Sequence, residues 1–229
     1  MSSRITGISS MATRQVLAEL AGAYRLQGGV VVEFESLGGV DAAKRVHAGE
    51  PFDVVVLAAD AVDKLIAAGR VIGDSKTDLV RSGVGIAVRK GSARPDISSE
   101  EMLRRAVLSA RTLGYSTGPS GVALMKLFER WGIADTIRER IVQAPPGIPV
   151  GQLVADGEVE LGFQQLSELM HLPGIAVLGT MPPGTEIVTI FSAGQCATST
   201  QPEAVRALLA FMSSPAADQP KRRHGMESA

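Results

Sequence analysis

The apolar residues of this chain change their spacing repeatedly, from the continuous or alternating runs of strands to the three-and-four spacing of amphipathic helices. Strand-like runs occupy residues 4–8, 30–34 and 52–57, and a helix-like segment follows each of them. Such alternation is typical of α/β proteins, in which helices connect parallel strands by right-handed crossovers. The sequence therefore predicts an α/β fold that begins with three consecutive β-α units.

The same alternation continues toward the carboxyl terminus. Strand-like residues recur at 84–88, 113–115, 159–163 and from 186, and helix-like residues recur at 98–107, 122–131, 149–154 and 205–212. The tail from Ser213 is polar and contains proline, so we expect it to fray. The length of 229 residues suits one large domain or two small ones.

Composition excludes several classes of function. Lysine and arginine number 23 against 24 aspartate and glutamate residues, and a net charge of −1 gives no reason to expect a nucleic-acid partner. No apolar run approaches the ~20 residues that span a bilayer, so membrane insertion is not expected. With one cysteine, Cys196, and three scattered histidines, the sequence predicts neither a metal site nor a cofactor.

The amino-terminal segment bears on location. Residues 1–7 lack the charged head, the long apolar stretch and the small-residue cleavage site of a signal peptide. We therefore expect a cytoplasmic protein, or a periplasmic one if a leader has been removed.

Four segments rich in hydroxyl, amide and small residues are expected at the carboxyl ends of strands. They are Ser9–Met11, Ser36–Gly39, Ser116–Gly121 and Gln164–Gln165. In open α/β sheets, ligands bind beyond these strand ends, where peptide N–H groups at helix starts face the ligand. Any one such loop is ordinary, because these residues also serve as caps and turns. Four loops at equivalent strand ends favour a pocket of neutral donors that binds an anion.

The candidate ligand-binding residues follow from these loops. They are Ser9, Ser10, Ser36, Gly38, Thr117, Gly118, Ser120, Gly121, Gln164 and Gln165, together with Arg14 in the helix turn after the first loop. An arginine at that position is able to pair with a carboxylate, although it is more often a solvated surface charge.

A group for acid–base chemistry is harder to find. Glu168 is a candidate general base close to Gln164, although a glutamate on the surface of a helix is the more common case. The sequence therefore assigns no catalytic residue.

Several blocks of sequence resemble a known family. Phe34–Ser36 followed by Val46–Val56 contains a serine loop, a helix and an A-G-x-P-x-D-V motif. Asp156–Phe163 is similar to a later G-E-A-D-x-G block, and Ala204–Pro215 to a terminal helix with an S-P-x-A ending. Over nearly its whole length, the chain resembles the periplasmic molybdate-binding proteins, the solute receptors of molybdate ABC transporters.

This resemblance implies a type 2 periplasmic-binding-protein fold with two α/β lobes, each a mainly parallel sheet with flanking helices. Lobe one would comprise residues 1–81 and 190–229, lobe two residues 82–189, with a ligand cleft between them. In this family, hydroxyl and backbone donors from both lobes hold an oxyanion. The corresponding positions fall near Ser9 or Ser10, Ser36, Thr117–Gly121, Val150 and Gln164. An ABC permease would be a partner only if the chain were exported.

The sequence also departs from the molybdate binders. Many of them carry tyrosine where this chain has Gln164–Gln165, and the Tyr115–Gly121 loop looks more like a divergent branch that includes aconitate isomerases. The leading hypothesis is binding of a small oxyanion or carboxylate. The alternative is an isomerase that acts on an unsaturated polycarboxylate, such as aconitate, by proton transfer. A ligand-sensing domain of a transcription regulator is disfavoured, because no helix-turn-helix precedes Ile5 and the charge is neutral.

Overall fold

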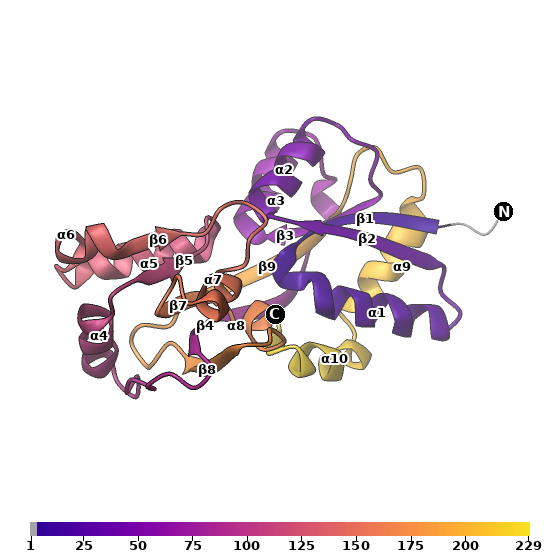
Figure 1. The fold of residues 1–229 in the computed structure, drawn as a ribbon. Helices are drawn as coiled ribbons and strands as arrows, with labels where there is room; N and C mark the ends of the chain where they lie inside the picture. Colours follow the sequence, from indigo (N-terminus) through magenta and orange to yellow (C-terminus); the bar gives the residue numbers. More distant parts are fainter. Residues whose placement is uncertain (1–3) are drawn as a thin grey trace. The chain divides into compact units, whose positions relative to one another are not determined.

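A computed structural model describes residues 4–229 (Figure 1). These residues form two compact units: unit one contains residues 4–82 and Thr189–Ala229, and unit two contains Gly83–Val188. Residues 1–3, part of the segment in which leader features were sought, lie outside the described residues. In the described part of the chain, no helix combines the length and the apolar character needed to cross a membrane.

Unit one alternates strands and helices along the chain. Its strands are β1 (Arg4–Ser10), β2 (Val31–Leu37), β3 (Val54–Ala58), the first part of β4 (Thr77–Arg89), most of β9 (Val188–Gln195) and β10 (Met226–Ser228). Its helices are α1 (Arg14–Leu26), α2 (Gly39–His47), α3 (Ala59–Ala67), α9 (Pro202–Met212) and α10 (Asp218–Arg223), with 3-10 turns at Met11–Thr13, Gly73–Ser75 and Pro215–Ala217.

The sheet of unit one is centred on β1 and β3. Strand β1 is parallel to both β2 and β3, which confirms the three predicted β-α units. Strand β3 is buried throughout, and its side chains alternate between two apolar clusters. Val54 and Val56 pack with residues of α1 and α9, whereas Val55 and Leu57 pack with residues of α2 and α3. The continuous apolar run of β3 therefore reflects helices on both faces of the sheet.

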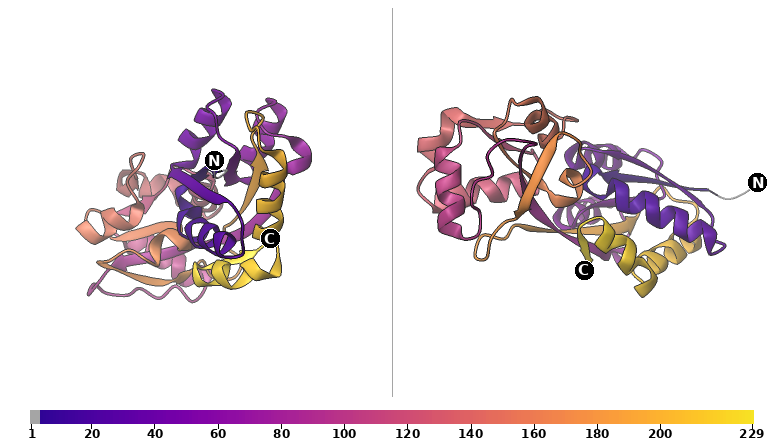
Figure 2. Two further views of the ribbon diagram at one scale, coloured as in Figure 1. Left: turned by 90° about the vertical axis from the view of Figure 1, so that its right-hand side faces the viewer. Right: turned by 60° about the horizontal axis from the view of Figure 1, so that its bottom comes forward.

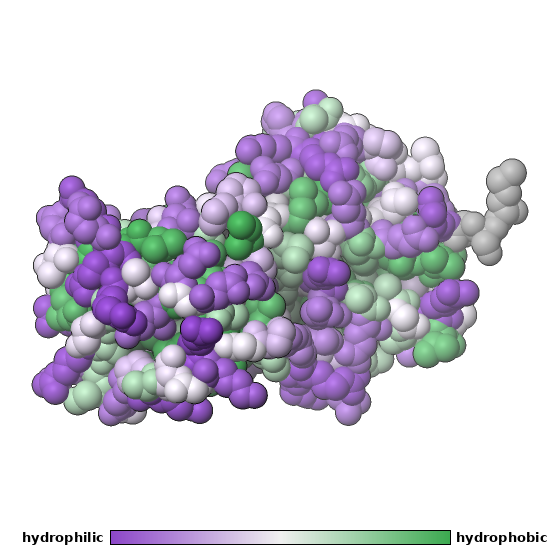
Figure 3. Space-filling view, in the orientation of Figure 1, coloured by the Kyte–Doolittle hydropathy of each residue, from purple (hydrophilic) through white to green (hydrophobic). Residues whose placement is uncertain are grey.

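The carboxyl-terminal tail corrects one prediction, because it is folded. Strand β10 pairs antiparallel with β4 in the register Met226 to Ser82, and Met226 is buried. Lys221 is 1% exposed, and its Nζ donates to Ser228 Oγ at 3.2 Å. Helix α10 packs against α1 (Figure 2), where His224 Nε2 lies 2.8 Å from Glu19 Oε2. The prediction of fraying was wrong because a few buried contacts anchor a largely polar segment, whose hydrophilic surface over α10 is visible in Figure 3.

Unit two has the same alternating organisation. Its strands are the remainder of β4, β5 (Leu113–Tyr115), β6 (Ile141–Gln143), β7 (Leu161–Gln165) and β8 (Ile175–Thr180). Its helices are α4 (Glu100–Ser109), α5 (Pro119–Arg130), α6 (Ala134–Ile137), α7 (Val150–Asp156) and α8 (Leu166–Leu169), with a 3-10 turn at Arg138–Arg140.

Strand β5 is parallel to β6 and β7, whereas β4 is antiparallel to β7 and β8. The core of unit two centres on Phe128 of α5. Its ring contacts Phe163 of β7 edge-on, with 6.1 Å between the ring centroids, and lies 5.9 Å from the ring of Trp131. These contacts fix α5 on the sheet, and with it the loop that precedes the helix.

All four predicted loop segments lie at least partly in regular structure. Ser9 and Ser10 are the last residues of β1. Ser36 is inside β2, because pairing with β1 continues through Ser36 and Leu37. Helix α5 begins at Pro119, a residue favoured at a first helical position, so Ser120 and Gly121 lie in its first turn. Gln164 and Gln165 are the last residues of β7.

Candidate functional site

Two serines meet at the carboxyl end of the parallel strands in unit one. Ser9 of β1 is in register with Ser36 of β2, and their Oγ atoms lie 2.8 Å apart. Ser9 is fully buried, whereas Ser36 is partly exposed. Either hydroxyl is able to donate in this pair. When one hydroxyl donates to a bound acceptor, the other is therefore able to donate to it in turn.

The start of α2 lies beside this pair. Gly38 caps the helix, and its carbonyl accepts from the N–H groups of Asp41 and Ala42 at 2.9 Å each. Ser10 Oγ accepts from Ala12 N at 3.4 Å, and a Cβ added to Gly39 would lie 3.6 Å from that oxygen. The first N–H groups of a helix have no partner within the helix, and they favour anions.

Arg14 shares a small cavity with one of these serines. The cavity has a volume of about 360 Å³ between α1 and β2, and its lining includes Arg14, Arg25, Phe34 and Ser36. Arg14 is itself exposed, as expected for a solvated arginine. Unit one therefore brings together Ser9, Ser10, Ser36 and Gly38 at one end of the sheet, and places Arg14 in a cavity with Ser36.

In unit two, the segments after β5 and β7 start at the same edge of the sheet. The strands are parallel, with Tyr115 in register with Phe163. The loop after β5 places Ser116 Oγ 3.5 Å from the Oγ of buried Ser120. Gly118 caps α5, and its carbonyl accepts from the N–H of Gly121 at 3.0 Å. Thr117 is exposed at the tip of this loop.

Gly121 is required for the shape of this loop. A Cβ added at this position would lie 1.9 Å from the carbonyl oxygen of Ser116. Only glycine permits the helix to approach the loop backbone so closely. The residues after Ser116 are therefore held against the first turn of α5.

The start of α7 meets the end of β7 through Gln164. Val150, the first residue of α7, is fully buried, and the next N–H, of Gly151, donates to Gln164 Oε1 at 3.1 Å. Gln165 is also buried, but its side chain leaves the strand on the opposite face. Unit two therefore gathers Thr117, Gly118, Ser120, Gly121, Val150 and Gln164 at one edge, with Gln165 directed away from them.

The structure adds Glu168 to this group. Gln164 Nε2 donates to Glu168 Oε1 at 2.9 Å, so the amide bridges the start of α7 and the carboxyl group. Burial raises the pKa of Glu168 to about 7, although the hydrogen bond from Gln164 acts in the opposite direction. The preference for an ordinary surface glutamate was wrong, because α8 follows β7 without an intervening loop and carries Glu168 back toward Gln164.

The cysteine and the potential metal ligands are less suited to catalysis. Cys196 is buried, and this burial, together with the smaller effect of the Asp53 charge, raises the pKa of its thiol to about 12. The thiol is therefore protonated near neutral pH. Among residues 4–229, no three His, Cys, Asp or Glu side chains are grouped to hold a metal ion.

Together these groups can perform two kinds of chemistry. Hydroxyl, amide and peptide N–H donors at both strand-end clusters are suited to hold an anion. A carboxyl group that titrates near neutral pH is suited to take up and return a proton. That one ligand contacts donors of both units stays a prediction.

Comparison with known proteins places this site in context. The chain is 38% identical over 216 residues to an aconitate isomerase from Pseudomonas sp., covering 92% of this chain and 82% of that protein. The periplasmic molybdate-binding protein of Azotobacter vinelandii has the same fold, with a TM-score of 0.80 at 20% identity over 97% of this chain and 98% of that one. The sulfate-binding protein SubI of Mycobacterium tuberculosis has a TM-score of 0.78 at 19% identity, over 98% and 86% of the two chains.

These likenesses confirm the predicted fold class and the resemblance to molybdate-binding proteins and to the aconitate isomerase branch. The model of the bacterial extracellular solute-binding protein family matches residues 5–227. The chain therefore belongs to the bacterial extracellular solute-binding protein family.

Proposed function

We propose that this protein binds a small unsaturated polycarboxylate and isomerises it by proton transfer, with Glu168 as the base. The observation that carries the proposal is the Gly151–Gln164–Glu168 chain of hydrogen bonds, which places a desolvated carboxyl group beside the start of α7. The relative named as an aconitate isomerase supports aconitate as the first substrate to test.

The reaction needs one group that moves a proton and several that hold charge. Glu168 as a carboxylate removes a proton from the carbon next to a substrate carboxylate, and the electron pair spreads over the neighbouring double bond and carboxylate. Glu168 then returns the proton to the other end of this allylic system, and the double bond is left shifted. No oxidant, reductant or metal is required by this balance.

The neutral donors have a separate role in this scheme. Peptide N–H groups at the start of α5 and the hydroxyls of Ser116, Thr117 and Ser120 are suited to bind substrate carboxylates. Charge that develops on a carboxylate oxygen during proton removal strengthens such hydrogen bonds, which lowers the barrier. Gln164 positions the Glu168 carboxyl group through its 2.9 Å hydrogen bond.

Proton NMR of cis- and trans-aconitate in D₂O with the purified protein tests the proposal. We expect interconversion of the two isomers, with deuterium entering the substrate. Unchanged spectra after long incubation would exclude this substrate.

Receptor function without chemistry is the second candidate. It is favoured by the neutral donors at both strand-end clusters and by the folds shared with molybdate- and sulfate-binding proteins. Isothermal titration with molybdate, tungstate, sulfate, citrate and aconitate separates the two. A receptor would bind at least one anion and leave aconitate unchanged, whereas no heat with any anion argues against both candidates.

A further inference from the structure

Unit two contains a second cavity, away from the donors described above. Its volume is about 850 Å³, and its walls include Arg89 at the end of β4, Arg105 of α4, Thr112 before β5 and Glu160 before β7. Because β5 and β7 are parallel, the residues that precede them lie at the opposite edge of the sheet from Gln164. The cavity therefore belongs to a different face of the unit from the candidate anion site.

The walls of this cavity combine an apolar surface with positive charge. The apolar part exposes Ala93, Pro95 and Met102, with Val88, Val159 and Leu161 buried beneath them, and the cationic part contains Arg89, Arg94, Arg105 and Arg111. Cavities of roughly 300–1,000 Å³ with largely apolar walls and a few polar groups are typical of small-molecule sites. The lining therefore suits a ligand with an apolar body and an anionic group.

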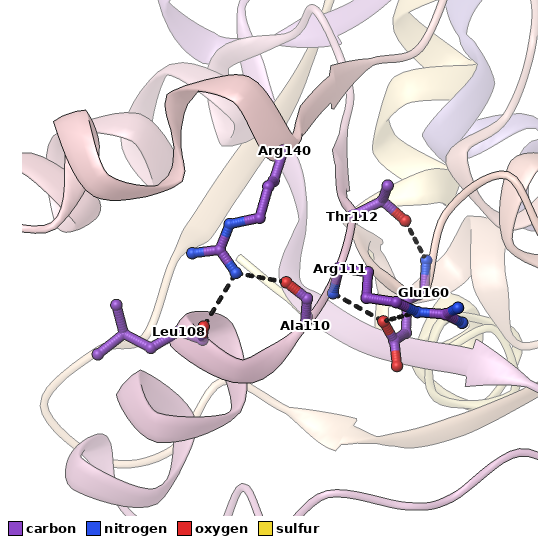
Figure 4. Close-up of polar contacts among 6 residues, drawn as sticks. All are labelled: Leu108, Ala110, Arg111, Thr112, Arg140 and Glu160. Atoms are coloured by element: carbon purple, nitrogen blue, oxygen red, sulfur yellow. Dashed lines mark hydrogen bonds and ion pairs between the residues drawn. The ribbon is translucent and has the colours of Figure 1, made fainter.

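Two of the arginines already have carboxylate partners. Arg111 Nε lies 3.2 Å from Glu160 Oε2, which also accepts from the Arg111 backbone N–H at 2.7 Å (Figure 4). The backbone hydrogen bond and the Arg111 side chain hold the pKa of Glu160 below its usual value. Arg105 pairs with Glu101 on the same helix. These two arginines offer little free positive charge to a ligand.

Arg89 and Arg94 differ from them. Neither forms an ion pair with any residue in the described part of the chain, and the contact of Arg94 Nη2 is with the neutral carbonyl of Val177 at 3.5 Å. Asp96, an acidic residue in the lining, accepts from the backbone N–H of Ser98 at 2.8 Å. Glu158 is the other carboxylate in the lining besides Glu160. Arg89 and Arg94 are thus left as cations at the cavity without a carboxylate partner.

The carboxyl terminus of α4 does not neutralise the positive charge of Arg89 and Arg94. Arg140 Nη1 donates to the carbonyls of Leu108 and Ala110 at 2.9 and 2.6 Å (Figure 4). A helix carboxyl terminus carries partial negative charge, and a cation there stabilises it. Since Arg140 fulfils this role and is not part of the cavity lining, the guanidinium groups of the cavity stay available.

We propose that this cavity is a second ligand site, which binds an organic anion with an apolar body and a phosphate or carboxylate head group. Arg89 and Arg94 bind the head group, and the partly exposed side chains of Pro95 and Met102 contact the body. The site is separate from the proposed isomerase site and does not depend on it.

Titration of the full-length chain with 1-naphthyl phosphate tests this site, with 1-naphthoate, inorganic phosphate and 1-naphthol as comparison probes. Amide shifts in ¹H–¹⁵N NMR spectra locate the binding. We expect 1-naphthyl phosphate to bind more tightly than phosphate or naphthol alone, with shifts at Ser92, Thr112 and Gly157. The relative affinities of 1-naphthyl phosphate and 1-naphthoate distinguish a phosphate head group from a carboxylate.

Variants at the cavity provide the decisive comparison. The double variant Arg89→Met/Arg94→Met should weaken the binding of 1-naphthyl phosphate at least about tenfold. Arg104→Met removes an exposed arginine from the same helix as Arg105 and should leave the affinity within about twofold. Ser109→Trp, at an exposed position of the lining, should block binding without removing a charge.

Shifts confined to other parts of the chain would overturn the proposal, as would equal affinity of the double variant and the Arg104→Met control. Circular dichroism melting of each variant separates loss of binding from loss of folding. The aconitate assay reports on the residues around Glu168, whereas the naphthyl phosphate titration reports on the cavity with Arg89 and Arg94. Failure of one proposal therefore does not decide the other.

Discussion

The two units of this protein have similar donor groups at their strand ends but differ in the reactive groups that accompany them. In unit one, the paired hydroxyls of Ser9 and Ser36 and the start of α2 form a cluster of neutral donors. Unit two has equivalent donors in the loop after β5, and adds a carboxyl group, Glu168, whose pKa burial raises to about 7. The comparison teaches that binding an anion needs only donors, whereas moving a proton also needs a group that titrates near neutral pH.

The largest effect is expected from Glu168→Gln in unit two. This change keeps an acceptor oxygen for Gln164 Nε2 but removes the group that takes the proton, so aconitate isomerisation should fall by about 10²–10⁴-fold. NMR rate measurements provide the test, and titration should show that aconitate still binds. Glu129→Gln, at an exposed position of α5, is the matched control and should retain full activity.

If Glu168→Gln isomerised aconitate at the rate of the Glu129→Gln control, Glu168 would not be the base, and the titratable group of unit two would have no role in catalysis. Loss of both binding and folding would indicate a structural role for Glu168.

The next effect concerns the shape of the donor loop in unit two. Gly121→Ala forces a Cβ against the Ser116 carbonyl oxygen, so the loop must shift, and we expect a loss of about 1–3 kcal/mol in the free energy of unfolding. Gly118→Ala is the control, because no atom lies within 4 Å of its added Cβ. Urea unfolding should show a change of less than about 0.5 kcal/mol for that control. Equal losses would contradict the assigned role of Gly121.

A smaller effect is expected from Ser36→Ala in unit one. Removal of one neutral hydrogen bond typically costs about 0.5–1.5 kcal/mol, so aconitate affinity should fall by a few-fold to about tenfold. Isothermal titration measures this loss, and Thr200→Ala, which removes an exposed hydroxyl from the same unit, should not reproduce it. Unchanged affinity of Ser36→Ala would mean that unit one takes no part in binding.

The smallest effect is expected from Arg14→Gln. Arg14 is exposed, and solvent screens its charge, so the loss of affinity should correspond to about 0.2–1 kcal/mol and should shrink as salt is added. Titration at low and high ionic strength measures both features. A large loss that salt does not change would show that Arg14 is buried against the ligand.

Much of the fold could be predicted because its signals are local. The run Val54–Leu57 is apolar on both faces of β3, and the helices on either side repeat every three or four residues. The folded tail could not be predicted in this way. Its anchoring depends on pairing between Met226 and Ser82, which are far apart in the sequence.

The sequence indicated the donors of the candidate site and named Glu168 as a candidate base, but it did not favour Glu168 over an ordinary surface glutamate. Serine, threonine and glycine at strand ends are visible in the sequence as loop residues. The pKa of Glu168 is not visible, because it depends on burial and on a hydrogen bond that a four-residue helix directly after β7 makes possible. The closeness of Gln164 and Glu168 in the sequence made Glu168 a candidate, but their hydrogen bond became visible only in the structure.

The pH dependence of kcat/KM for aconitate tests the role of Glu168 most directly, because this ratio reports the ionisation of the free enzyme. The base must be deprotonated, so kcat/KM should rise as the pH increases through about 7 and then level off. A rise centred near 4.5, the usual value for a glutamate, or a profile without any rise would contradict the proposal that Glu168 is the base.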